Sequence, residues 1–397
     1  MVIDRSRRLA LAWMGAAMAA PLLARAQHQH HRMAAPGAPA LGATAVYDRS
    51  GVLWSAYTEG AQVLLARSTD LGRTWSAGTR VNPSPEATDP GGDARPKIAL
   101  GTEGEIYVSW TRALDQPYTG EIRFSRSLDG GRSFSAPVTV HKDRQLIAHR
   151  FDSMVVDREG RVFVAWIDKR EVAAAMVAGL TAHRGAAVYF AVSGDRGASF
   201  GGDYRLAEHS CECCRIALAL GQDGGVRAMW RHVFDPNVRD HAVAQMYPDG
   251  RAGELQRVSF DDWRSDACPH HGPALATDAA GRLHCAWFTG AEGRAGVYYA
   301  RLRGAEVEAL RRIGAETAAH ADIAVSGARV ALAWKEFDGR QSQLCALLSE
   351  DGGERFRLLR LDSTAGPSGR PQLLLAHDRF YAFWNRLHEP LSLVQLT

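Results

Sequence analysis

The feature that most constrains the fold of this chain is a hairpin that recurs seven times. In each copy an aromatic residue closes a short apolar strand, and the copies follow one another at intervals of 47 to 64 residues. Because one small sheet cannot bury both of its faces, a strand repeat of this length predicts sheets packed radially, as in a propeller. Seven hairpins predict seven blades. The closing residues are Tyr57, Trp110, Trp166, Trp230, Trp287, Trp334 and Trp384.

A second hairpin carries the pattern Ser-x-Asp-x-Gly-x-x-aromatic. In this pattern the carboxylate can accept backbone N–H groups of its own turn, and the glycine can adopt a positive φ. The aromatic side chain is free to pack beneath the turn. Four segments match, at residues 68–75, 127–134, 193–200 and 349–356.

Four such turns in register with seven hairpins resemble the Asp-box, or bacterial neuraminidase repeat, of sialidase-like propellers. The resemblance covers essentially all of the chain after residue 40. It implies an all-β, seven-bladed β-propeller of four-stranded antiparallel blades with Asp-box turns, which in that family are structural and lie opposite the active site. Cys-x-Cys-Cys, followed one blade later by Cys-Pro, is similar to an uncharacterised secreted group of these proteins.

The N-terminal region is predicted to be a targeting segment. Arginines precede an apolar run from Leu9 to Leu23, and Ala24-Arg25-Ala26 offers small residues for cleavage, so residues 1–26 are expected to be a cleavable signal peptide for periplasmic or secreted protein. Arg7-Arg8 also resembles a twin-arginine signal, and both export routes stay open. We then expect residues 27–40 to be a His-rich flexible segment and residues 41–397 to form the propeller.

Charge and hydropathy narrow the choice of partners. The formal net charge is +3, too small a balance to argue for nucleic acid or a membrane surface. The apolar run near the N-terminus is shorter than the ~20 residues that span a bilayer. We therefore expect no nucleic-acid partner and no membrane span. We also expect the protein to be a monomer.

Each blade is preceded by a lead-in segment, and these segments are expected to gather at one end of the central channel, where propellers usually carry their sites. Arginine recurs in or near four of them. The pattern predicts a ring that binds a small anionic or glycan ligand, made of Arg95, Arg150, Arg215 and Arg370.

Cysteines and histidines occur together in the lead-in segments of the fourth and fifth blades, which the fold places side by side. Thiolate sulfur and imidazole nitrogen are ligands suited to copper or zinc. The predicted metal ligands are Cys211, Cys213, Cys214, Cys268, His270 and His271, with His28, His30 and His31 as auxiliary donors. Cys285 and Cys345 lie within apolar strands and are expected to be buried hydrophobic residues.

The cysteine group has two interpretations. In an oxidising compartment the four thiols can pair, through Cys268 and one of the trio or through a vicinal Cys213–Cys214 bond. Alternatively they hold a metal ion, copper ahead of zinc. The leading functional hypothesis is metal binding or handling, with copper or zinc as the cofactor.

Two other function classes stay open. The family resemblance implies an exo-sialidase-like glycoside hydrolase, which would use three arginines, a tyrosine nucleophile with a glutamate partner, and an aspartate. The Arg-Ile-Pro motif of that family is absent, and no Tyr/Glu pair is evident in the sequence. We therefore expect sialidase activity to be absent or very weak. The third class is a non-catalytic scaffold that binds glycans or proteins.

Two local features complete the expectations. The link after Trp166 is Ala-rich over residues 172–180 and predicts a short helix. The last blade is left without a fourth strand, which either residues 35–42 supply or the blade lacks.

Overall fold

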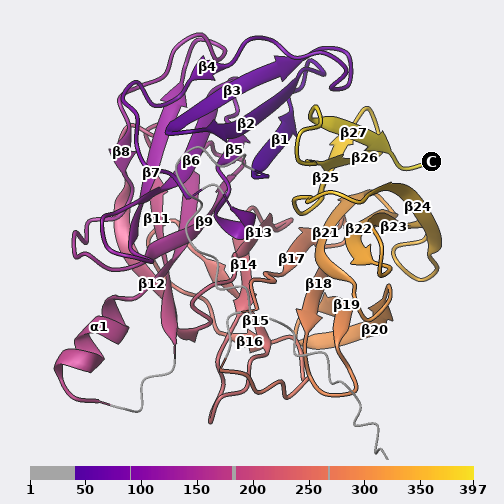
Figure 1. The fold of residues 1–397 in the computed structure, drawn as a ribbon. Coiled ribbons are helices and arrows are strands. Elements are labelled where there is room, and N and C mark those ends of the chain that lie inside the picture. Colours follow the sequence, from indigo (N-terminus) through magenta and orange to yellow (C-terminus); the bar gives the residue numbers. More distant parts are fainter. Residues whose placement is uncertain (1–40, 90, 181–184, 267–268) are drawn as a thin grey trace, which may run out of the picture. The chain divides into compact units, whose positions relative to one another are not determined.

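The computed structural model describes residues 41–89, 91–180, 185–266 and 269–397. These residues form seven antiparallel sheets arranged as the blades of a β-propeller (Figure 1), as the recurring hairpin predicts. First strands of neighbouring blades contact one another all the way around the ring and line its centre.

The strands of blades 1 to 4 run in sequence order within each sheet. They are β1 (Ala43–Tyr47), β2 (Leu53–Glu59), β3 (Gln62–Ser68) and β4 (Thr79–Arg80); β5 (Lys97–Leu100), β6 (Ile106–Ala113), β7 (Gly120–Ser127) and β8 (Val138–Thr139); β9 (His149–Val156), β10 (Val162–Asp168), β11 (Ala186–Ser193) and β12 (Gly201–Ser210); β13 (Ala217–Leu220), β14 (Val226–Arg231), β15 (His241–Met246) and β16 (Gln256–Arg257).

Blades 5 to 7 continue the pattern, with one difference. Their strands are β17 (Ala274–Thr277), β18 (Leu283–Thr289), β19 (Gly296–Arg303) and β20 (Glu306–Ile313); β21 (Ala319–Ser326), β22 (Arg329–Phe337), β23 (Ser342–Ser349) and β24 (Arg357–Thr364); β25 (Gln372–Ala376), β26 (Arg379–Trp384) and β27 (Ser392–Gln395). Blade 7 therefore has three strands among the described residues. Residues 41 and 42 supply no fourth strand, and 35–40 lie outside the described residues.

Helical structure is confined to two short elements. A 3-10 turn, η1 (Gly92–Ala94), precedes β5, and α1 (Arg170–Val177) follows β10 within the Ala-rich link where a helix was predicted. No helix among the described residues is long and apolar enough to cross a membrane.

All seven hairpin aromatic residues lie on the second strand of their blade, as predicted. The six tryptophans among them are fully buried between blades. The four Ser-x-Asp turns also form as expected. In the turn of blade 3, for example, Asp195 Oδ1 accepts the N–H groups of Ala198 and Ser199 at 3.0 and 2.9 Å, and Gly197 has φ of 76°.

Most of the buried indole N–H groups donate to an acceptor near their own blade. The indole of Trp166 donates to Asp168 at 2.8 Å, whereas the indole N–H of Trp230 has no hydrogen-bond partner among the described residues. An unpaired buried donor costs free energy that a paired one does not. Blade 4 therefore differs from the other blades near its tryptophan.

This difference predicts unequal costs for the same substitution. Both Trp166→Phe and Trp230→Phe remove part of a buried ring, but only the first also removes a hydrogen bond, the one that the indole donates to the buried carboxylate of Asp168. We expect Trp166→Phe to lower the free energy of unfolding by about 1–2 kcal/mol more than Trp230→Phe. Urea unfolding followed by far-UV circular dichroism measures both. Equal losses would show that the Trp166–Asp168 hydrogen bond contributes nothing net.

Candidate functional site

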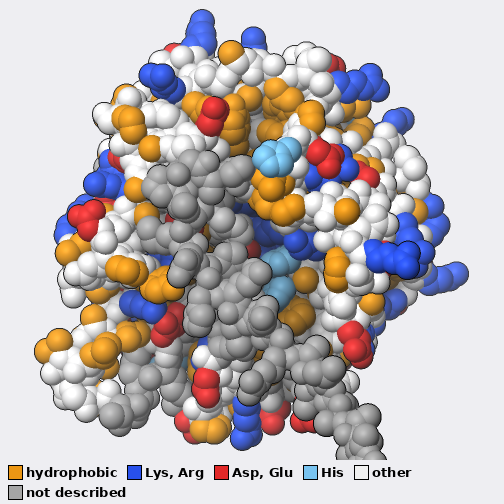
Figure 2. Space-filling model, in the orientation of Figure 1, with side chains coloured by type: hydrophobic (Ala, Val, Ile, Leu, Met, Phe, Trp, Pro, Cys, Tyr) orange, Lys and Arg blue, Asp and Glu red, His pale blue; other side chains and the backbone are white. Residues whose placement is uncertain are grey.

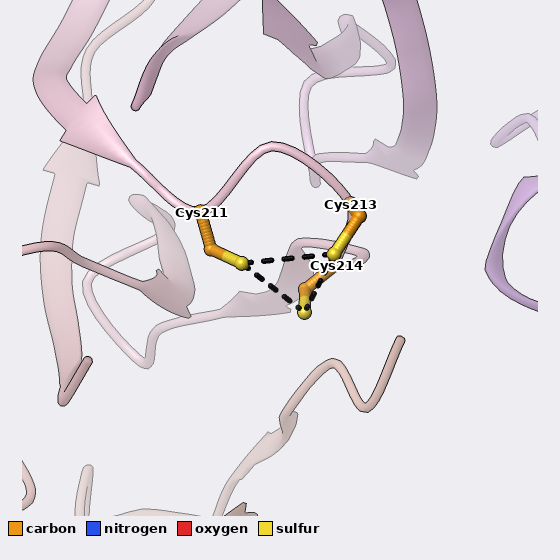
Figure 3. Close-up of side chains that lie close together, drawn as sticks. All are labelled: Cys211, Cys213 and Cys214. Carbon is orange, nitrogen blue, oxygen red and sulfur yellow. Dashed lines mark hydrogen bonds between the residues drawn. The ribbon is translucent and has the colours of Figure 1, made fainter. Parts of the chain in front are cut away.

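Three cysteines occupy the lead-in segment of blade 4, between β12 and β13. Cys211 is held by its backbone N–H, which donates to the carbonyl of Arg231 at 2.9 Å. The side chains of Cys211, Cys213 and Cys214 turn toward one another from this loop (Figure 3) and are 0%, 4% and 2% exposed. Local chain reversal within four residues thus brings three sulfurs together beneath the surface.

The distances between the sulfurs restrict their chemistry. Cys211 Sγ lies 3.8 Å from Cys213 Sγ and 3.7 Å from Cys214 Sγ, and the last two are 4.0 Å apart. A disulfide needs about 2.05 Å, so the trio is not bridged internally and the vicinal Cys213–Cys214 bond is not formed. The trio is the one group of three or more potential ligands within metal-binding range among the described residues.

Hydrogen bonds within the trio, and then nearby arginines, favour the ionised form of Cys211. Hydrogen bonds from Cys213 and Cys214 lower the pKa of Cys211 well below its usual value, burial opposes this, and the charges of Arg231 and Arg239 add to the lowering. Arg239 Nη1 lies 3.5 Å from Cys211 Sγ. The pKa of Cys214 is raised because its thiol hydrogen-bonds to Cys211. Without a metal, the trio therefore centres its negative charge on Cys211.

The other predicted metal ligands lie elsewhere or outside the described residues. His271 stacks on Phe288 at 4.2 Å and faces His320 at 4.4 Å between ring centroids, and the ring of His270 lies 6.3 Å from that of Phe151. Neither joins the group of three sulfurs. Cys268, His28, His30 and His31 lie outside the described residues. Three of the six predicted ligands thus come together.

The two remaining cysteines lie buried in apolar strands, as predicted from the sequence. Cys285 lies in β18 and Cys345 in β23, and both are buried. Burial raises the pKa of each thiol, that of Cys345 to about 12. Both are therefore neutral thiols within apolar strands.

Two of the four predicted ring arginines converge on one carboxylate, that of Asp93 in η1, and a third, Arg95, contacts one of these two. Arg215 Nη1 donates to Asp93 Oδ1 at 3.0 Å, and Arg370 Nε lies 3.7 Å from the same oxygen. Arg95 Nη1 donates to the carbonyl of Arg370 at 3.1 Å. Arg150 does not join them, because it pairs with Asp89 and lies over the ring of Phe151.

The sequence did not indicate Asp93 as the centre of this cluster. Burial alone would raise its pKa, but the charges of Arg215, Arg370 and His320 outweigh burial and hold the pKa far below the usual range. Its Oδ2 also accepts the backbone N–H groups of Arg215 and Gly272, at 3.3 and 3.2 Å. Asp93 therefore ties the lead-in segments of several blades together.

Next to this cluster the central channel holds a cavity of about 210 Å³. Arg95, Lys97, Arg215 and Arg370 line it, with Asp322 as the acidic member. Burial lowers the pKa of Arg95 to about 10 and that of Lys97 to about 8. Figure 2 shows Lys or Arg side chains and a histidine side chain close together near the middle of this face. The channel is thus rich in desolvated cations.

His241, at the start of β15, is a further residue that the sequence did not single out. It is 1% exposed, and neither of its ring nitrogens has a hydrogen-bond partner among the described residues. Burial and then the charge of Arg231 lower its pKa, while the charge of Cys211 acts in the opposite direction. A neutral imidazole that accepts and donates no hydrogen bond in the described part of the chain therefore lies within electrostatic range of the cysteine trio.

A Tyr/Glu pair, which the sequence did not reveal, is present in blade 3. Tyr189 on β11 donates to Glu171 of α1, and the guanidinium of Arg170 lies 4.1 Å over its ring. Burial and then the Glu171 contact raise the pKa of Tyr189. A nucleophilic tyrosinate would need the opposite shift, so this pair does not resemble an activated nucleophile.

Comparison with known proteins defines the fold but not a family. No protein-family model and no curated protein sequence matches the chain. Solved structures do: an ulvan lyase of a new polysaccharide lyase family bound to -[GlcA(1-4)Rha3S]- is 11% identical with a TM-score of 0.56, over 92% of this chain and 95% of that one. A protein of unknown function from Dyadobacter fermentans is 13% identical with a TM-score of 0.55, over 91% and 98%. At such identities the likeness concerns the propeller fold.

Proposed function

We propose that this protein is an exported Asp-box propeller that binds a thiophilic transition metal ion, copper ahead of zinc, through Cys211, Cys213 and Cys214. The observation that carries the proposal is the spacing of the three sulfurs, 3.7 to 4.0 Å. An ion about 2.3 Å from each sulfur would separate them by about 4.0 Å in a trigonal plane and about 3.8 Å in a tetrahedron. The trio already has the geometry that such an ion requires.

The order of the metals rests on ligand number and charge. Zinc sites are usually completed by four protein donors, or by three and a water molecule, whereas the described group offers three buried sulfurs. Three thiolates around a monovalent copper ion leave two negative charges, which match the guanidinium groups of Arg231 and Arg239. A buried site favours such a balance, because uncompensated charge is costly there.

Two parts of the proposal depend on the sequence alone. Periplasmic or secreted location rests on the signal-like residues 1–26, and membership of the Asp-box family rests on the four Ser-x-Asp turns. Cys268 and the N-terminal histidines remain predicted contributors, because they follow or precede the trio in segments rich in metal-binding residues.

An anaerobic titration of the purified, mildly reduced protein tests the proposal. We expect saturation near one Cu(I) per chain, with zinc bound more weakly in competition against a chromophoric chelator. Protein that holds no metal after purification and takes up neither ion after reduction would show that the trio is not a metal site.

A second candidate function is binding of an acidic saccharide in the central channel. The specific observation is that Nε of Arg95 and Nε of Arg370 have no hydrogen-bond partner among the described residues, beside a cavity of about 210 Å³. The similar ulvan lyase was solved with a saccharide of GlcA and Rha3S bound, which agrees with an anionic ligand on this fold. An exo-sialidase-like hydrolase is the enzymatic form of this candidate.

Hydrolysis itself is expected to be absent or very weak. Asp93 already supplies a carboxylate to the arginine cluster, and Tyr189 carries a raised pKa. A fluorogenic sialoside incubated with the protein should release no more fluorophore than with an Arg370→Ala variant. Robust release by the unaltered protein that is lost in Arg370→Ala would promote the enzymatic candidate above metal binding.

A further inference from the structure

A groove of about 500 Å³ lies between blades 4 and 5, at the opposite end of β13 from the cysteine trio. Cys214 precedes β13, whereas Gly221 and Gln222, which line the groove, follow it. The groove therefore belongs to the face that carries the Ser-x-Asp turns. It is separate from both the trio and the channel cluster.

A recurring side chain is missing beside the groove. In four blades the aromatic residue that ends the Ser-x-Asp turn packs against the preceding blade. Phe200 meets Phe124 at 4.9 Å and Phe356 meets Tyr299 at 5.3 Å between ring centroids, and the indole of Trp75 donates to the carbonyl of Leu391 at 3.2 Å. These aromatic side chains fill the space between blades at this end of the ring.

Blade 5 has no such residue. Its third and fourth strands are joined by a tight turn at Gly304 and Ala305, between Arg303 and Glu306. The side chain that packs between blades 4 and 5 is the smaller Val307. The volume that an aromatic ring fills elsewhere is left open here.

The lining combines an apolar floor with polar walls that are not satisfied internally. The partly exposed Leu283 contributes apolar surface, beside the buried Leu302. Nη1 of Arg227, Nε2 of Gln256 and Oγ1 of Thr277 have no hydrogen-bond partner among the described residues. Buried polar groups are normally paired, so a ligand that offers both donors and acceptors would relieve this cost.

We propose that this groove binds a neutral saccharide. Sugar hydroxyls donate and accept hydrogen bonds, while the C–H faces of the ring pack on apolar surface. A volume of about 500 Å³ is within the range of small-ligand sites. Charge argues against an anion, because Asp223 neutralises Arg227 at 2.9 Å and Glu254 also lines the groove.

Saturation-transfer NMR with a panel of methyl glycosides and neutral disaccharides tests this. We expect transfer to at least one sugar and an affinity at least tenfold lower in Arg227→Ala. Arg161→Ala is the matched control, because Arg161 pairs with Asp157 in blade 3 as Arg227 pairs with Asp223 in blade 4. The control should bind as the unaltered protein does.

A filling variant separates loss of binding from loss of folding. Val307→Trp places an aromatic ring where other blades carry one, so it should abolish transfer while the protein stays folded by circular dichroism. Absence of transfer to every sugar of the panel, or transfer unchanged in Arg227→Ala, overturns the proposal. Either result is independent of metal binding at the cysteine trio.

Discussion

Replacing Cys214 with serine is expected to lower the metal content of the purified protein at least tenfold, from about one ion per chain. Cys214 Sγ lies 3.7 Å from Cys211 Sγ and 4.0 Å from Cys213 Sγ, so it is one of three donors at near-equal spacing. A serine hydroxyl is a harder donor and a poor ligand for copper. Two sulfurs alone would hold the ion far less tightly.

Elemental analysis of protein prepared under reducing, anaerobic conditions measures this effect. Cys285→Ser is the matched control, because it removes a buried thiol in β18 that does not belong to the trio. The control should keep its metal even where it loses stability. Metal retained in Cys214→Ser at the level of the unaltered protein would contradict the proposed ligand set.

The second prediction with a large expected effect concerns the carboxylate of Asp93 in η1. Asp93→Asn keeps the shape of the side chain but removes the charge that compensates Arg215 and Arg370. Breaking one side of a buried ion pair typically costs about 3–5 kcal/mol, since the remaining charges stay buried without a partner. We expect a loss of that order in the free energy of unfolding, measured by urea denaturation.

The control for this variant is Asp351→Asn, on an exposed turn of blade 6. Its urea midpoint should shift much less than that of Asp93→Asn. A small loss in Asp93→Asn, comparable with that of the control, would show that the arginine cluster is compensated by other groups such as Asp322.

The sign of the pH dependence follows from the same carboxylate. The pKa of Asp93 is lowered in the folded protein relative to its ordinary value of 3.8. Its contribution to stability is therefore complete above about pH 4 and decreases as the pH falls below that value, because the unfolded chain then binds the proton first. Asp93→Asn should flatten this acid limb of the stability curve.

The fold was predictable because its signal is repeated along the chain. Each hairpin alone is a weak pattern, but Trp166, Trp230 and Trp334 recur at matching positions and all lie on second strands. The trio was predictable for a local reason, since Cys211, Cys213 and Cys214 are too close in sequence to separate within one loop. A repeated pattern thus predicted the fold, and a local pattern predicted that the three sulfurs lie close together.

The sequence could not predict which residues of other segments a given side chain would contact. His271 follows Cys268 closely in sequence, yet its ring stacks on Phe288 and His320. Arg150 lies at the start of β9, whereas Arg95 precedes β5, and Arg150 pairs with Asp89. Asp93 is the partner of arginines from blades that are distant in sequence. Such contacts join segments that are distant in sequence, 61 residues apart for Arg150 and Asp89 and 122 residues apart for Arg215 and Asp93.

Blade 7, with three strands among the described residues, also determines how the ring holds together. The chain passes directly from one blade to the next at six of the seven boundaries, whereas within residues 41–397, as far as they are described, blades 1 and 7 meet through non-covalent contacts alone. Gln372 accepts the N–H of Ala45 at 3.0 Å and donates to its carbonyl at 2.9 Å. This seam is the natural starting point for partial unfolding, so amide hydrogens of β1 and β27 should exchange with solvent through smaller openings than those of blades 3 to 5.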